Sequence, residues 1–182
     1  MKKKALLLYS TIDGQTFAII SKIALRIAEY AEDIEYEVYD LRKLPDINLA
    51  NYTAVLLGAA IRYNKFNKPF LHFIKIHHDQ LNQMKTAFLC VNLSARKQGK
   101  DTPETNGYTK NFLAKTTWRP KLVAVFAGSL RYPRYAWYDK LIIKFLMWIG
   151  GEKQDLTKEY NYTNWQKVDE FAEHFIKFVQ QS

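Results

Sequence analysis

The sequence predicts an α/β domain built on a doubly wound, five-stranded parallel sheet. Apolar, strand-like runs alternate with helical patterns along all 182 residues, and this alternation is typical of parallel sheets. The length fits one domain with a continuous core, and no repeat, low-complexity tract or linker divides the chain. We therefore expect a single domain over 1–182, with one extra segment at 131–162.

Five strand-like runs are expected to form the strands of this sheet. They are Lys4–Tyr9, Glu35–Asp40, Ala54–Gly58, Thr86–Leu93 and Leu122–Leu130. The first helix is expected over about 15–31, because apolar residues recur there on one stripe. The link over 41–51 is short and contains a proline, so only a stunted helix is expected in it.

Two further helices follow from capping and spacing. Pro69 suits the first turn of a helix, and apolar residues then recur at helical spacing at Phe70, Phe73, Ile74, His77 and Leu81. The run from Thr163 to Gln166 reads as a T-x-x-Q capping box that opens the last helix. Its inward stripe is expected at Trp165, Val168, Ala172, Phe175 and Val179.

The segment Arg131–Tyr162 exceeds the five-fold pattern. It begins with an aromatic and basic run and continues over 141–149 as a helix that is apolar on most of its circumference. Such a helix must pack on protein, dock a partner or lie in a membrane interface. Aromatic and basic residues at its entrance fit the interface, while packing over the domain or in a homo-oligomer is the alternative.

A hydroxyl- and glycine-containing turn follows the first strand and opens the first helix. The free N–H groups and positive dipole end of a helix start bind phosphate, and hydroxyls add donors. The turn lacks both common nucleotide signatures, and turns of this kind are typical of FMN sites in flavodoxin-like domains. The alternative is a capped helix with no ligand. The candidate residues are Ser10, Thr11, Ile12, Asp13, Gly14, Gln15 and Thr16.

In a flavodoxin-like arrangement, the loops after the third and fourth strands lie along the flavin ring. Tyr63 either stacks on the ring or is an ordinary exposed aromatic residue. A positive charge from Arg62 or Arg96 near the pyrimidine side would favour the anionic reduced flavin. The candidate residues of these loops are Ala60, Ile61, Arg62, Tyr63, Asn92, Leu93, Ser94 and Ala95.

The net charge of +9 is concentrated after predicted strands. The segments 62–68, 94–121 and 131–144 carry +3, +5 and +3. They begin at the carboxyl edge of the sheet, where open α/β folds bind ligands, so an anionic partner is expected. No signal peptide or membrane-spanning stretch is visible, which predicts a cytosolic protein that can still attach to a membrane.

Other chemistries find little support in the sequence. The lone Cys90 lies in an apolar strand without cationic neighbours, so we expect an inert core thiol. His72, His77 and His78 share a helix but no i, i+4 spacing, and no metal site is expected. No nucleophile elbow is present. A bound organic cofactor that carries the reaction remains.

The chain resembles the menaquinone-dependent protoporphyrinogen IX dehydrogenases, small flavodoxin-like enzymes of bacterial heme synthesis. The most selective motif is R-Y-P-R-Y-x-W-Y-D at 131–139, and the resemblance runs nearly end to end. The other shared motifs are Ser10-Thr11, Asp13–Thr16, Gly58-Ala59, Ile61–Tyr63, Val91–Leu93, Ala95–Lys97, Thr102-Pro103, Thr105-Asn106, Trp118–Pro120, Gly150–Glu152 and Tyr162-Thr163.

The resemblance implies an FMN enzyme that oxidises protoporphyrinogen IX and passes electrons to menaquinone. It implies a peripheral protein at the cytoplasmic side of the inner membrane. A positive rim suits the two substrate propionates, and we expect Arg131 and Arg134 to bind them, with Arg62 and Arg96 as further candidates. No general base is evident. Asp13 replaces the hydroxyl usual in flavodoxins, and we expect it to turn away and cap the helix.

Three other functions stay open at this stage. A nicotinamide-dependent quinone reductase of the same fold would need an NAD(P)H site, and no motif demands one. A flavodoxin electron shuttle is disfavoured, because such carriers are typically acidic. A non-catalytic module that uses its basic rim to bind a membrane or nucleic acid is the alternative from another class, and nucleic acid is not the partner we expect.

Overall fold

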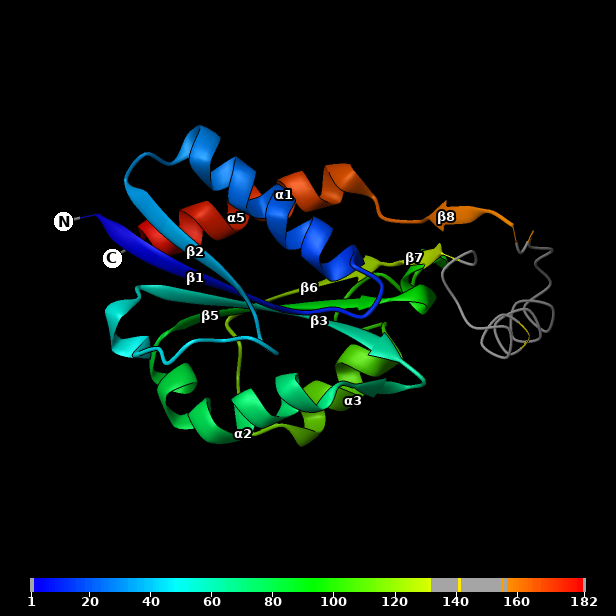
Figure 1. The fold of residues 1–182 in the computed structure, drawn as a ribbon, viewed down its shortest axis with the longest axis horizontal. Coiled ribbons are helices and arrows are strands. Elements are labelled where there is room, and N and C mark those ends of the chain that lie inside the picture. Colours follow the sequence, from blue (N-terminus) through cyan, green and yellow to red (C-terminus); the bar gives the residue numbers. More distant parts are fainter. Residues whose placement is uncertain (1, 132–140, 142–154, 156, 182) are drawn as a thin grey trace.

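Figure 1 shows the computed structural model, which describes residues 2–131, 141, 155 and 157–181. The central sheet has the order β2-β1-β3-β5-β6, and all neighbouring pairs in this order are parallel. The predicted doubly wound parallel sheet is therefore confirmed. Its strands are β1 (Lys3–Ser10), β2 (Ile34–Asp40), β3 (Ala54–Arg62), β5 (Lys85–Asn92) and β6 (Leu122–Ala127).

Helices cover both faces of this sheet (Figure 1). On one face, α1 (Gln15–Tyr30) and α5 (Trp165–Gln180) pack on the sheet and on each other. On the other face lie α2 (Lys68–Gln83) and α3 (Gly107–Lys115). Each face has its own buried apolar cluster, which explains why the strands other than the edge strand β2 are continuously apolar rather than alternating.

The starts of two helices can be compared with their predicted caps. Asn67 caps α2 by accepting a hydrogen bond from the Phe70 N–H, and the proline lies in the first turn as predicted. The predicted T-x-x-Q capping box of α5 is wrong. Asn164 is the N-cap, because its side chain accepts from the Lys167 N–H, and Trp165 is 37% exposed rather than part of the inward stripe.

Two strands end elsewhere than predicted. The third strand runs four residues beyond Gly58 and turns back into the short β4 (Lys65–Phe66), which pairs antiparallel with β3. The fifth predicted strand breaks at Gly128. Beyond that break, β7 (Ser129–Arg131) pairs antiparallel with β8 (Glu159–Asn161) in a separate two-stranded ribbon, the β7–β8 ribbon. The remaining short elements are the 3₁₀ turns η1 (Leu49–Asn51) and η2 (Leu93–Arg96).

The helix predicted over 141–149 lies outside the described residues, apart from Leu141, whose side chain is exposed. Arg134 also lies outside them, and so does the side chain of Arg131. Within the part of the chain that the structure describes, no helix is long and apolar enough to cross a membrane.

Cys90 lies fully buried in the middle of β5. Burial raises the pKa of its thiol to about 11, because the thiolate would lose its hydration. We expect the native protein to resist iodoacetamide at pH 8, and the denatured protein to be alkylated at once. Mass spectrometry after timed quenching measures both rates, and rapid labelling of the native form would contradict the buried placement.

Candidate functional site

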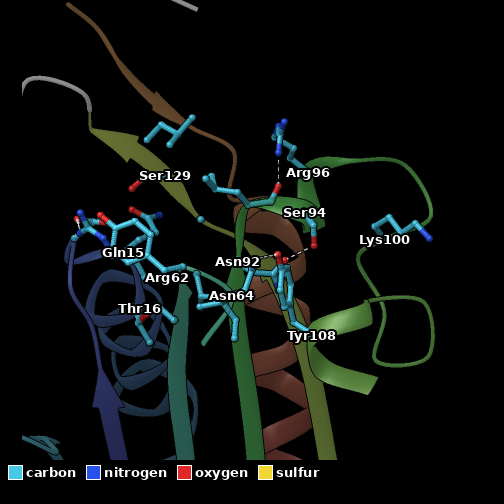
Figure 2. Close-up of a pocket in the computed structure, with 18 of the residues that line it drawn as sticks. Gln15, Thr16, Arg62, Asn64, Asn92, Ser94, Arg96, Lys100, Tyr108 and Ser129 are labelled. Carbon is cyan, nitrogen blue, oxygen red and sulfur yellow. Dashed lines mark hydrogen bonds and ion pairs between the residues drawn. The ribbon is translucent and has the colours of Figure 1, made fainter. Parts of the chain in front are cut away.

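A cavity of about 910 Å³ opens at the carboxyl edge of the parallel sheet. Its walls come from the segments that follow β1, β3, β5 and β6, which are remote in sequence and meet only because the strands are parallel. Figure 2 shows Gln15, Thr16 and Ser129 on one side and Ser94, Tyr108 and Lys100 on the other. The charge pattern of the sequence predicts a ligand at this edge.

The turn between β1 and α1 supplies one side of the cavity. Gly14 adopts φ 83°, a left-handed conformation that suits glycine, and its N–H donates to the Thr11 Oγ1 at 2.9 Å. Of the seven residues predicted here, four line the cavity, namely Thr11, Asp13, Gln15 and Thr16. Ser10 accepts a hydrogen bond from the Asn67 side chain, and the Ile12 side chain is 48% exposed.

Asp13 does not behave as predicted. The N-cap of α1 is Gly14, with no side-chain cap, and the Asp13 carboxylate instead lies 3.1 Å from the Arg62 guanidinium. The expectation that Asp13 caps the helix is therefore wrong. Pairing with Arg62 offsets the carboxylate charge, so that this acidic residue can stand beside an anion-binding turn.

The end of β3 forms a tight hairpin at the rim of the cavity. Tyr63 and Asn64 have φ of 48° and 61°, both left-handed, as a two-residue type I′ turn requires. The Tyr108 hydroxyl on α3 donates to the Asn64 side-chain oxygen at 2.6 Å. Thus Ala60, Ile61 and Arg62, predicted in a loop, lie at a strand end, and the hairpin is held against α3.

A buried amide network fixes the segment after β5. Asn92 accepts hydrogen bonds from the Ala95 N–H at 3.1 Å and from the Ser94 hydroxyl at 2.6 Å. Asn106 donates to Asn92 at 3.2 Å and to the Lys100 carbonyl at 2.8 Å. Three of the four residues predicted in this segment therefore line the cavity, namely Asn92, Leu93 and Ser94. The fourth, Ala95, is buried and does not line it.

Two buried hydroxyls in the cavity wall have no hydrogen-bond partner among the described residues. They are the Thr16 Oγ1, on a fully buried residue, and the Ser129 Oγ, on a residue that is 9% exposed. Leaving such a group unpaired costs free energy, so native proteins rarely do so without a ligand or an ordered water. Both hydroxyls lie near the start of α1, where N–H groups favour an anion.

The sequence has close relatives of known name. Residues 6–157 match the flavodoxin domain family. A protoporphyrinogen IX dehydrogenase (quinone) from Escherichia coli strain K12 is 44% identical over 169 residues, which cover 93% of this chain and 92% of that protein. A protein of the same name from Leishmania major is 45% identical, over 94% of this chain and 74% of that protein. The chain belongs to the protoporphyrinogen IX dehydrogenase (quinone) family.

Solved structures confirm the flavodoxin-like fold of this dehydrogenase family member. Oxidised flavodoxin 1 from Bacillus cereus matches with a TM-score of 0.57 at 17% identity, over 99% of this chain and 100% of that one. A flavodoxin from the domain Archaea matches with a TM-score of 0.53 at 15% identity, over 98% and 99%. At this level of identity the likeness concerns the fold alone.

The cofactor of this flavodoxin domain is FMN, and the cavity residues fit it. The cavity volume lies within the range that proteins use for small ligands. The unpartnered hydroxyls of Thr16 and Ser129 offer two donors to a phosphate. The confirmed family membership thus agrees with an observation made on the structure itself.

The charge in the cavity wall is mainly positive. Arg62, Arg96, Lys97 and Lys100 line it together with the carboxylate of Asp13. The Arg96 guanidinium donates to the Leu93 carbonyl at 2.8 Å and lies 5.7 Å from the centre of the Tyr162 ring. Arg62 and Arg96 were expected at this site, whereas the two lysines were seen only as part of a basic segment.

Sequence reasoning missed several other cavity residues. They lie in the β3–β4 hairpin, near the end of β5, in and just before α3, and directly after β6. These residues are Asn64, Val91, Thr105, Gly107, Tyr108, Asn111, Gly128, Ser129 and Leu130. Val91 and Thr105 fall in motifs that carry the resemblance, but no role at the site was predicted for them.

Proposed function

We propose that this chain oxidises protoporphyrinogen IX to protoporphyrin IX with FMN and passes the electrons to menaquinone in heme biosynthesis. The observation that carries the proposal is the cavity, which combines phosphate-binding hydroxyls with a positive wall. Relatives named for this reaction, at 44% and 45% identity over most of the chain, support it.

Bound FMN supplies a two-electron acceptor that is reoxidised by a quinone. The residues of this chain bind and orient the reactants. Thr11 and Thr16 hold the phosphate together with Ser10, Ile12, Asp13, Gly14 and Gln15 of the same turn. Ala60, Ile61 and Asn92 at the strand ends lie beside the ring together with Leu93 and Ser94 of η2, which Ala95 supports from behind. Tyr63 at the hairpin rim stacks on the ring. No residue is assigned as a general base.

The positive wall binds the substrate propionates in this proposal. Arg131 and Arg134 remain the first candidates, and among described side chains Arg96 and Arg62 support the same role. Because replacing Arg62 would also break its ion pair with Asp13 in the phosphate turn, Arg96 is tested first.

We expect Arg96→Ala to raise the KM for protoporphyrinogen IX about tenfold, because one charge-assisted hydrogen bond to the substrate is lost. The kcat should stay similar. The substrate's dimethyl ester, which lacks the carboxylates, should show little change between the two proteins. Lys110→Ala is the control, because Lys110 is exposed on α3 outside the cavity. An equal loss with acid and ester would contradict the assignment.

We further propose that the protein works as a peripheral protein at the cytoplasmic side of the inner membrane. A menaquinone acceptor resides in the membrane, and the basic segments of the chain favour an anionic lipid surface. Co-sedimentation with vesicles that contain anionic lipid, but not with neutral vesicles, is the expected result.

An anaerobic assay tests the proposed reaction. Purified, FMN-loaded protein is mixed with protoporphyrinogen IX and a menaquinone analogue, and porphyrin fluorescence is followed. We expect porphyrin to appear only with quinone present, and the activity to disappear when FMN is removed. Flavin that stays oxidised with protoporphyrinogen but bleaches with NAD(P)H would instead identify a nicotinamide-dependent quinone reductase.

A further inference from the structure

The Ser129 hydroxyl is a buried polar group that the predicted phosphate turn does not include. The residue begins β7, is 9% exposed and lines the cavity. Its Oγ has no hydrogen-bond partner among the described residues. A buried hydroxyl that faces a cavity in this state is a donor available to whatever the cavity binds.

The surroundings of Ser129 tie it to the start of α1. Ser129 pairs in register with Asn161 across the β7–β8 ribbon. The Gln15 side chain, at the first position of α1, donates to the Asn161 Oδ1 at 3.2 Å and to the Thr163 Oγ1 at 2.8 Å. Thr163 in turn donates to the Ala127 carbonyl at the end of β6, at 2.7 Å. These bonds hold the ribbon beside the phosphate turn.

Figure 2 shows the same arrangement from the cavity. Ser129 lies next to Gln15 and on the same side as Thr16, across from Tyr108 and Lys100. The two hydroxyls without a partner among the described residues therefore share one side of the cavity, and they come from different elements, α1 and β7. A single acceptor with several oxygens, such as a phosphate, can satisfy both.

We propose that Ser129 donates a hydrogen bond to the phosphate of bound FMN, so that the β7–β8 ribbon completes the phosphate site. This proposal rests on the FMN-dependent function above. A hydrogen bond from a hydroxyl to a charged phosphate is stronger than one between two neutral groups. The contact therefore contributes to the affinity for FMN. The phosphate thereby links the turn after β1 to the ribbon that leads into the segment after β7.

The test compares FMN with riboflavin, which lacks the phosphate. Apoprotein is titrated into each flavin, and quenching of flavin fluorescence gives the dissociation constant. We expect Ser129→Ala to weaken FMN binding by about tenfold, because one charge-assisted hydrogen bond is lost. Riboflavin binding should stay unchanged. Thr157→Ala is the matched control, because the Thr157 hydroxyl lies outside the cavity and donates to Asp155 at 2.7 Å.

Thermal unfolding distinguishes a role of Ser129 in binding FMN from a role in the stability of the fold. Removing a buried, unpaired hydroxyl should leave the apoprotein at least as stable as the wild type, while the rise in Tm on adding FMN becomes smaller. If the alanine variant does not fold, Ser129→Cys keeps the side-chain size with a weaker donor, and the same loss of FMN affinity is expected.

Two results would overturn the proposal. One is FMN affinity of the Ser129 variants equal to that of the wild type, which would mean that water satisfies the hydroxyl. The other is an equal loss of affinity for FMN and for riboflavin, which would mean that Ser129 contacts the ring or the ribityl chain that both flavins share. Absence of FMN binding by the wild type would instead overturn the proposed function.

Discussion

Replacing Thr16 by valine is expected to weaken FMN binding by about 10- to 100-fold, the range for a lost hydrogen bond to a charged group. Thr16 is fully buried at the second position of α1, and its hydroxyl is one of the two unpartnered ones in the cavity. Valine keeps the shape of threonine. Its shape matters because the Thr16 methyl group lies so close to Gly58 that a Cβ at that glycine would approach it to 3.0 Å.

The affinity of Thr16→Val is measured by titrating apoprotein into FMN. Thr16→Ser is the control, because it keeps the hydroxyl and removes only the methyl group, so its FMN affinity should stay near that of the wild type. The valine apoprotein should unfold at the wild-type temperature or above it, since the Thr16 hydroxyl makes no hydrogen bond to the described part of the chain. Wild-type affinity in the valine variant would show that the turn does not use this hydroxyl for phosphate.

Replacing Phe88 by alanine is expected to lower the free energy of unfolding by about 3–5 kcal/mol, the usual cost of removing a large buried aromatic ring. Phe88 is fully buried in β5, an interior strand that lies between β3 and β6. Its ring lies 5.6 Å from that of Phe70 on α2 and 5.7 Å from that of Trp118, measured between centroids. The change therefore opens a cavity where α2 meets the sheet.

Urea unfolding followed by circular dichroism measures this loss. Because natural domains are stable by only about 5–15 kcal/mol, the variant should unfold at a much lower urea concentration. Leu71→Ala is the matched control on α2, since its side chain is 44% exposed, and a change within about 0.5 kcal/mol is expected. A loss below about 1 kcal/mol for Phe88→Ala would contradict the packing described for this face.

Most of the regular fold could be predicted from the sequence because four of the five parallel strands are continuous apolar runs that pack on both faces. The edge strand β2 instead alternates polar and apolar residues, and Pro69 marked the start of α2. Strand ends and short pairings were predicted less well. The β3–β4 hairpin depends on two left-handed residues, Tyr63 and Asn64, and tyrosine does not signal that conformation. The break at Gly128 depends on pairing with β8, which is remote in sequence.

The site could be predicted where a local motif carried it. The turn after β1 and the segments after β3 and β5 do meet at one cavity, and the resemblance to protoporphyrinogen IX dehydrogenases is confirmed. The wrong predictions concern two side chains, each of which can form a hydrogen bond or ion pair with more than one partner. Asp13 pairs with Arg62 rather than the helix start, and Thr163 bonds to Ala127 rather than capping α5. Only the folded chain decides between such partners.

The placement of α5 has a consequence for how the protein is made. The residues of α5 that pack on α1 and the sheet are Val168, Phe171, Ala172, Phe175, Ile176 and Val179. During synthesis the whole sheet and α1 leave the ribosome before this helix does. The part of this face that α5 covers then stays exposed to water until α5 has emerged, and we expect a chaperone to bind there.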